Sequence, residues 1–196
     1  MEEKGKEKKV KGAITISLAL IINARKDIDW QKEAGLTDQE LRLIKKGILA
    51  SAWYDQELWE KMTLGVWKLV GKGTPEGAYQ FGYGLVAKTL LNIYHGALAK
   101  DDPAAILARL ASLYNRTFFT SGTAEFEPTK EGGIFRISHP EGIPGQECYV
   151  AFIRGFLAKI VQENKGEKVR VECPEEALVN SQKLSSLTYQ IYWAKK

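Results

Sequence analysis

Few residues in this sequence have a type and spacing that could support catalysis. Nucleophilic catalysis needs a Ser or Cys beside a base, and the two histidines of the chain are His95 and His139. Neither lies in a nucleophile elbow or next to a cysteine. The sequence also lacks the glycine-rich loops that bind phosphate and the His-Glu-x-x-His motif of metalloproteases. Because no acid, base or nucleophile is assembled, we predict that the protein is not an enzyme.

Metal-binding chemistry has equally little support. Cys148 and Cys173 are far apart, and no second Cys or His lies near either of them, so each is expected to be a small buried hydrophobic residue. His95 could bind a metal or haem iron, but no carboxylate, Cys or second His stands at helical spacing to complete such a site. We therefore predict neither a metal nor a cofactor.

Aromatic residues near expected helix ends give the best indication of a binding site. Tyr and Trp combine apolar area with a polar group, which suits a small-molecule pocket, although the same residues also serve as core. One arginine stands alone in an apolar helical turn, so it is either exposed at the helix edge or paired with an anion such as a ligand carboxylate. The predicted ligand-binding residues are Trp53, Tyr54, Tyr94, His95 and Arg154.

The first part of the chain is expected to be helical. Residues 27–36 are polar and turn-like, and residues 37–40 (TDQE) then fit a capping box that begins a helix. Asp55 can cap a longer helix whose apolar residues recur at helical spacing. Thr74 and Asp102 are each followed by a proline, which favours the first helical position, so each begins a further helix.

The hydrophobic period changes in the second part of the chain. Residues 123–127 and 134–138 predict two strands joined by a glycine-containing turn, and residues 146–164 predict a helix. Apolar residues then alternate with polar ones over 169–173 and 187–193. The predicted fold class is α+β: an N-terminal helical part packs on a small four-stranded antiparallel sheet (ββαββ) with a helix between the two hairpins.

Length and composition bound the remaining possibilities. The 196 residues, 44% apolar and 27% charged, are typical of one globular domain. Residues 1–11 hold five lysines and three glutamates and are predicted to be a disordered charged arm, so that residues 12–196 form a single α+β domain. The net charge of +4 comes partly from this arm, and the body has no basic stripe, which argues against nucleic-acid binding.

Residues 13–24 (AITISLALIINA) are the one candidate for targeting. They fall well short of the ~20 residues that a membrane span needs, and they lack a small-x-small cleavage site. We predict a cytoplasmic protein without a membrane span.

A stripe of small residues lies in the helix predicted over 146–164. Ala151, Gly155 and Ala158 recur on one helical face and allow a backbone to come close, either to the protein's own sheet or to a second subunit. Together with the exposed edges of a short sheet, this stripe predicts a homodimer.

Several segments also carry a family resemblance: residues 10–12 (VKG), 52–55 (AWYD), 82–94 leading into 102–103, 118–122 (FFTSG) and 148–156. Over nearly the whole chain from Val10, they resemble a bacterial family found in many copies in myxobacteria. That family shares the wider fold of haem-nitric-oxide-binding domains, vinyl-reductase domains and Bet-three-type subunits of the Golgi transport complex.

The resemblance implies an α+β fold with an apolar chamber between helices and sheet, used for sensing or for building dimers. Haem-binding members carry a Tyr-x-Ser-x-Arg motif and a proximal histidine ahead of the first hairpin. This chain lacks the motif and has residues 110–114 (LASLY) where that histidine is expected. Vinyl-reductase-type domains end in a cysteine cluster, whereas Cys173 stands alone here.

Two functional hypotheses follow. The first is a non-catalytic sensory or binding module with a pocket for an apolar or amphiphilic small molecule between helices and sheet. The second is a structural homodimer or adaptor of the transport-subunit type, with the chamber filled by its own side chains.

Overall fold

The structure, a computed structural model, describes residues 7–98, 101–179 and 181–195. The first part contains strands β1 (Lys9–Lys11) and β2 (Trp53–Asp55) and helices α1 (Gly12–Ala24), α2 (Trp30–Ala34), α3 (Asp38–Lys46) and α4 (Gln56–Leu69). A long helical passage follows: α5 (Pro75–Phe81), the π-helix η1 (Gly82–Val86), α6 (Ala87–Ile93), α7 (His95–Leu98), α8 (Pro103–Leu113) and the π-helix η2 (Tyr114–Phe118). The last part contains β3 (Thr123–Pro128), β4 (Gly132–Ser138), α9 (Gln146–Glu163), β5 (Gly166–Glu172), the short 3-10 helix η3 (Pro174–Leu178) and β6 (Ser186–Lys195).

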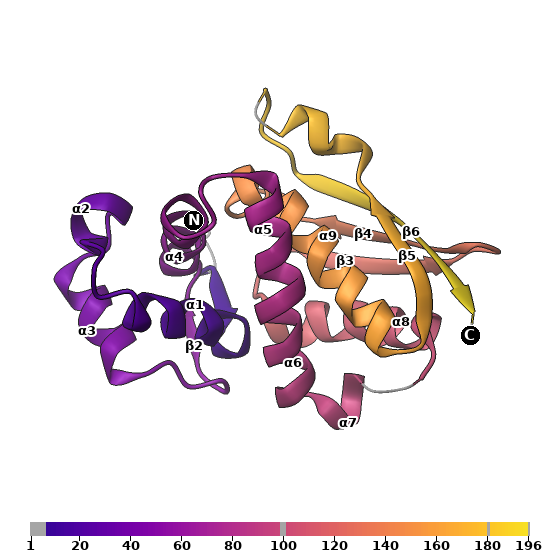
Figure 1. Cartoon of the computed structure of the whole chain (residues 1–196), viewed down its shortest axis with the longest axis horizontal. Helices are drawn as coiled ribbons and strands as arrows, with labels where there is room; N and C mark the ends of the chain where they lie inside the picture. Colours follow the sequence, from indigo (N-terminus) through magenta and orange to yellow (C-terminus); the bar gives the residue numbers. More distant parts are fainter. Residues whose placement is uncertain (1–6, 99–100, 180, 196) are drawn as a thin grey trace, which may run out of the picture.

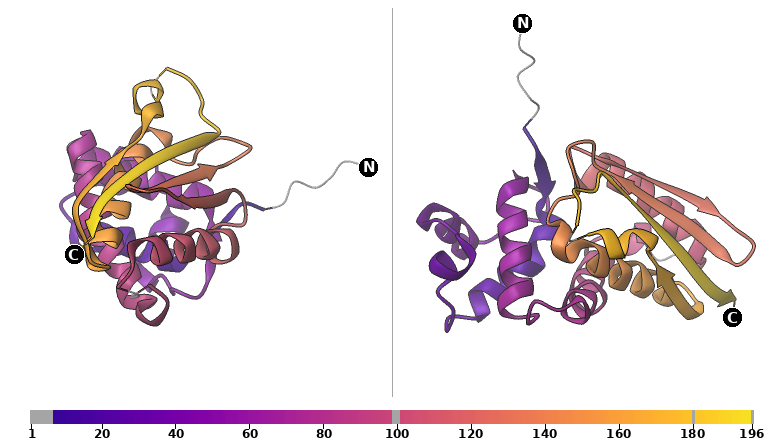
Figure 2. Two further views of the ribbon diagram at one scale, coloured as in Figure 1. Left: turned by 90° about the vertical axis from the view of Figure 1, so that its right-hand side faces the viewer. Right: turned by 90° about the horizontal axis from the view of Figure 1, so that it is seen from above.

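The elements are arranged in three parts: the N-terminal helices, the four-stranded sheet and a helical layer between them. Figure 1 shows α1–α4 at one end and the four-stranded sheet at the other, with α5 and α6 in the middle. The view from above in Figure 2 shows the same separation. Within residues 7–98, 101–179 and 181–195, no helix combines the length and apolar character that crossing a membrane requires.

The four-stranded sheet confirms the predicted α+β fold class. Its strand order is β3-β4-β6-β5, and every neighbouring pair is antiparallel. Its inner face is apolar because alternate residues such as Phe135, Leu187 and Ile191 are buried. Helix α9 lies between the β3–β4 hairpin and β5 in sequence and packs against the sheet through β5 and β6. Strands β5 and β6, predicted as the second hairpin, are not joined by a tight turn, since η3 lies in the connection between them.

The predicted helix starts are present. At α3, the Glu40 amide donates to Thr37 Oγ1 at 3.2 Å while the Thr37 amide donates to Glu40 Oε2 at 2.6 Å, which is the predicted capping box. Thr74 and Asp102 accept from the first amides of α5 and α8. Asp55 occupies the cap position of α4, but its side chain makes no capping hydrogen bond.

One prediction for the first part of the chain is wrong. Residues 27–36, expected to be a turn, contain helix α2. Asp29 caps it by accepting from the Lys32 amide at 3.2 Å, and Trp30 is buried. The helix has five residues, too few to show a helical period, so the sequence pattern concealed it.

The boundary of the predicted disordered arm also needs correction. Lys9–Lys11 form strand β1, which pairs with β2 in a small second sheet, and Val10 is fully buried. The alternation of two lysines around one valine is too short to stand out from a charged run. Residues 1–6 of the predicted arm lie outside the described residues.

The small-residue stripe of α9 packs inside its own chain. A Cβ atom at Gly155 would clash with the Tyr79 carbonyl of α5, and one at Gly82 would clash with the Phe152 carbonyl of α9. Ala151 and Ala158 are buried as well. The stripe therefore lets α9 cross α5 and η1 at close range, and it is not open to a second subunit.

Candidate functional site

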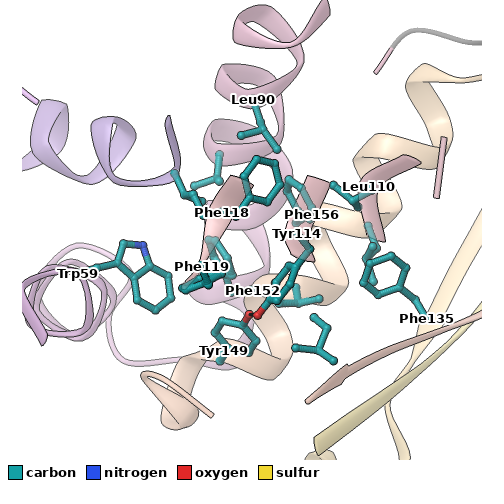
Figure 3. Close-up of a pocket in the computed structure, with 15 residues that line it drawn as sticks. Trp59, Leu90, Leu110, Tyr114, Phe118, Phe119, Phe135, Tyr149, Phe152 and Phe156 are labelled. Atoms are coloured by element: carbon teal, nitrogen blue, oxygen red, sulfur yellow. Dashed lines mark hydrogen bonds between the residues drawn. The ribbon is translucent and has the colours of Figure 1, made fainter. Parts of the chain in front are cut away.

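An apolar chamber lies where the N-terminal helices meet α9 and the sheet. Fifteen residues line it, of which eight are aromatic and none is charged. They come from α1, α4, η1, α6, α8, η2, β4 and α9, so every layer of the fold contributes to its wall. The labelled residues in Figure 3 are Trp59, Leu90, Leu110, Tyr114, Phe118, Phe119, Phe135, Tyr149, Phe152 and Phe156.

The chamber is almost filled by these side chains. Its remaining volume is about 30 Å³, room for two or three molecules of the size of water, each of which needs roughly 10–15 Å³ of such space. An apolar cavity of this kind stays dry, because water inside it would lack hydrogen-bond partners. Any larger occupant therefore has to displace aromatic rings.

Both π-helices of the described chain border the chamber. Val86 is the last residue of η1, and Tyr114 and Phe118 begin and end η2. π-helical turns are rare and recur at functional sites, because the extra residue weakens the regular helical hydrogen bonding. The chamber wall is therefore irregular where η1 contributes Val86 and where η2 contributes Tyr114 and Phe118.

A buried polar group of three side chains lies at the wall, and two of them, Tyr114 and Tyr149, line the chamber. The Tyr114 hydroxyl lies 2.5 Å from His139 Nε2 and 3.1 Å from the Tyr149 hydroxyl. Figure 3 shows the two hydroxyl groups next to each other. Burial raises the pKa of both tyrosines far above the ordinary value, and burial together with the charge of Lys8 lowers the pKa of His139 to about 4. All three groups are uncharged at neutral pH.

Trp59 carries the polar atom of the chamber wall that lacks a partner. Its side chain is 1% exposed, and no described atom accepts a hydrogen bond from its indole N–H. The ring packs edge-to-face against Phe119 and Tyr149, at centroid distances of 5.6 and 6.1 Å. A buried donor without a partner costs roughly 1–3 kcal/mol of stability, so it needs a structural or functional reason.

His139 also faces a second space. It lines a surface hollow of about 200 Å³ together with Lys8, Gln56, Ser121 and Glu141. Lys8 and Glu141 form an ion pair there. The imidazole therefore stands between the chamber wall, through Tyr114, and the solvent-facing hollow.

The first two predicted site residues lie away from the chamber. Trp53 is 39% exposed, and its ring lies under the ammonium group of Lys11, which is 4.4 Å from the ring centroid. The Tyr54 hydroxyl accepts from the Leu49 amide at 2.8 Å and so fixes the loop before β2. Both residues support the small β1–β2 sheet.

The other three predicted residues are also separated from one another. Tyr94 reaches the chamber only by touching Phe118, with ring centroids 5.8 Å apart, and His95 is exposed at the start of α7. Arg154 is paired within its own chain: it donates to both carboxylate oxygens of Glu176, at 2.9 and 2.7 Å, and to the Val171 carbonyl. The five residues do not form one site, and ligand binding by them stays a prediction.

The sequence contained a signal for the true lining. Tyr149, Phe152 and Phe156 follow one another at i, i+3 and i+7 along α9, which is the spacing of one helical face. The small residues Ala151, Gly155 and Ala158 lie on the opposite face of the same helix. Tyr114 continues the helical spacing of Ile106 and Leu110, but this pattern does not show that a π-helix begins at Tyr114.

Comparison with known proteins identifies solved structures that share this fold. No family model matches the sequence, and no curated protein matches it either. A mutant H-NOX protein from K. algicida, in the unliganded Fe(II) state, is similar with a TM-score of 0.63 at 12% identity, over 95% of this chain and 97% of that chain.

Two further solved structures agree with this similarity. An H-NOX protein from S. oneidensis in the Fe(II)NO state gives a TM-score of 0.59 at 14% identity, over 92% of this chain and 98% of that chain. An oxygen-binding H-NOX domain related to soluble guanylate cyclases gives 0.60 at 14% identity, over 94% and 95%. Identities this low establish the fold alone. The predicted resemblance is thereby confirmed at that level: the chain has the α+β fold of the haem-nitric-oxide-binding, or H-NOX, domains.

Proposed function

We propose that this chain is a non-catalytic binding or sensory module, and that its ligand is an apolar or amphiphilic small molecule held in the chamber between helices and sheet. The observation that carries the proposal is the wall itself. It brings eight aromatic side chains, two π-helices and one unpaired buried donor to a single uncharged space. Sites for small ligands are mostly apolar with few polar groups, and this wall has that character.

Haem, which the Fe(II) states of the H-NOX structures imply for those proteins, does not fit this chamber. The described lining contains no His, Cys or Met to bind iron and no Lys or Arg to pair with propionate groups. His139 is close, but its Nε2 is engaged by Tyr114. The raised pKa of Tyr114 and Tyr149 opposes a phenolate ligand. We therefore derive no function through haem.

Direct binding of a gas molecule to the closed cavity is also too weak to be useful. Even the best small ligands gain no more than about 1.5 kcal/mol per heavy atom, so two atoms give about 3 kcal/mol and a millimolar Kd. A ligand with useful affinity must be larger than the remaining 30 Å³. It must enter by rotating aromatic side chains of the wall, and this rearrangement could carry a signal to the surface.

Native mass spectrometry and thermal melting test this proposal. The protein is incubated with a panel of apolar and amphiphilic compounds, and bound mass and Tm are recorded. A ligand at 100 times its Kd should stabilise the fold by about 2.7 kcal/mol. Ile153→Trp, which fills the chamber from α9, should abolish binding, whereas Leu178→Trp on the exposed η3 should not. If no compound binds or shifts Tm, the proposal is rejected.

The small remaining volume favours the second candidate, a structural homodimer or adaptor with a filled core. The surfaces that suggested dimerisation are poorly suited to it, however, because the small-residue stripe of α9 packs inside its own chain. Asn115 closes the edge of β3, donating to the Ala124 carbonyl and accepting from its amide, and β5 has an irregular register between Glu167 and Arg170. The homodimer stays a prediction, which sedimentation at micromolar concentration tests. A monomer at every concentration would contradict it.

A further inference from the structure

We infer that the chamber ligand is an uncharged, largely apolar carbonyl compound whose oxygen accepts a hydrogen bond from the indole N–H of Trp59. The inference rests on the proposed function and names the chemistry of its ligand. It depends on which polar groups the chamber wall offers and on which charges it lacks.

Trp59 is the one donor in the described wall that is still free to bind a ligand. The Tyr114 hydroxyl is engaged by His139 and by Tyr149, so the hydroxyl groups of the wall already satisfy one another. The Trp59 indole has no such partner although it is buried. Figure 3 shows its ring entering the chamber from the side of α4, toward Phe119.

Other tryptophans show that this fold normally satisfies indole donors. Trp30 Nε1 donates to the Arg25 carbonyl at 3.1 Å, and Trp67 Nε1 donates to the Thr74 carbonyl at 2.8 Å. Neither residue lines the chamber. Of these three indole donors, the unpaired one is the one that lines the chamber, where an acceptor brought by a ligand would restore the missing bond.

The absence of charged side chains from the described wall argues against ionic ligands. No Lys, Arg, Asp or Glu lines the described chamber, and the candidate cation Arg154 is held by Glu176 beside a different, outer hollow. A carboxylate or an amine would lose its hydration on entry without gaining an opposite charge. A fatty acid is thus a poor ligand, whereas a neutral ketone or aldehyde keeps its single acceptor and adds no donor that needs a partner.

A matched set of compounds tests the inference. Fluorenone and fluorene have nearly the same flat shape and differ in one carbonyl group, and decanone and decane give the same comparison for a chain. Isothermal titration calorimetry should show that at least one ketone binds at least fivefold more tightly than its hydrocarbon. A fluorene carboxylate should bind at least tenfold more weakly than fluorenone.

Trp59→Phe keeps an aromatic ring and removes the N–H. It should lower ketone affinity to the level of the hydrocarbon and leave hydrocarbon affinity unchanged. Trp67→Phe is the control, because its indole N–H is already bonded outside the chamber, and it should leave both affinities unchanged. In the unmodified protein, nitrogen–proton NMR should show the indole resonance of Trp59 shifting with the ketone and not with the hydrocarbon. This measurement does not depend on whether the variant folds.

The outcomes separate the two claims. If ketone and hydrocarbon bind equally, or if the carboxylate binds best, the inference is overturned and the proposed function stands. If no compound of either shape binds, the proposed function fails and takes the inference with it.

Discussion

The Tyr114 hydroxyl and His139 Nε2 are 2.5 Å apart, and both groups are buried. This contact joins η2, which borders the chamber, to the residue that follows β4, beyond the sheet. Because His139 is 2% exposed and no described carboxylate pairs with it, the imidazole is neutral in the folded protein. A proton on both ring nitrogens would also prevent the Tyr114 hydroxyl from donating to Nε2.

Stability should therefore fall in mild acid. The folded-state pKa of His139 is about 4, below the ordinary value of about 6.5, so the unfolded chain binds the proton first. The contribution of neutral His139 to the free energy of unfolding is complete above about pH 6.5 and is lost as the pH falls toward 4. Between about pH 7 and pH 5 the loss is about 2 kcal/mol. Urea unfolding at a series of pH values measures the free energy of unfolding directly.

The matched variants for this prediction are His139→Gln and His95→Gln. His139→Gln should remove most of the slope between about pH 7 and 5, and His95→Gln should preserve it, because His95 is exposed. An unchanged slope in His139→Gln would show that another group is responsible.

The crossing of α9 with η1 makes a second prediction. Gly82→Ala should destabilise the fold by about 1–3 kcal/mol, since the new methyl group meets the Phe152 backbone and pushes the two helices apart. Gly84→Ala, two residues further along, meets nothing within 4 Å and should be neutral or stabilising by up to about 1 kcal/mol. Chemical denaturation compares the two, and equal effects would contradict the close crossing.

The ion pair of Arg154 and Glu176 makes a third prediction. It ties α9 to η3, and the two side chains are 32% and 37% exposed. Arg154→Met should cost about 1 kcal/mol or less in global stability, because water screens a partly exposed pair. Backbone hydrogen exchange should nevertheless become faster in residues 174–179, because the ion pair that holds η3 against α9 is lost.

Arg136→Met is the control for this variant, since Arg136 forms an exposed pair with Glu127 in the β3–β4 hairpin. It should leave exchange in residues 174–179 unchanged. Equal exchange in both variants would mean that Arg154 does not hold η3 in place.

A fourth prediction concerns haem. Titration with haemin should give no sharp, stoichiometric Soret band, because the described chamber wall offers no iron ligand and too little space. A stoichiometric band that disappears in His95→Ala or in His139→Gln would contradict our account of the chamber, and the variant that removes it would identify the ligand.

The sequence predicted the fold well because periods of two and 3.6 residues report which faces are buried. Capping residues such as Thr37 and Asp102 then placed helix starts correctly. The site was harder, since the aromatic cluster before and within α4 contains both Trp53 and Trp59. Trp53 lies on a small exposed sheet and Trp59 faces the chamber, and only the tertiary contacts of β1 and α9 separate them. The π-helices also escaped prediction, because one extra residue in a turn leaves no mark on a short apolar pattern.

The pairing of β1 has a consequence for how the chain is made. The Lys9 amide donates to Thr120 Oγ1 at 2.7 Å, across a separation of 111 residues, and Val10 bridges to Phe119 of the chamber wall. Contacts so distant in sequence form slowly. During synthesis, β1 can pair with β2 once residues 53–55 have emerged, but its contacts with Phe119 and Thr120 must wait for the middle of the chain.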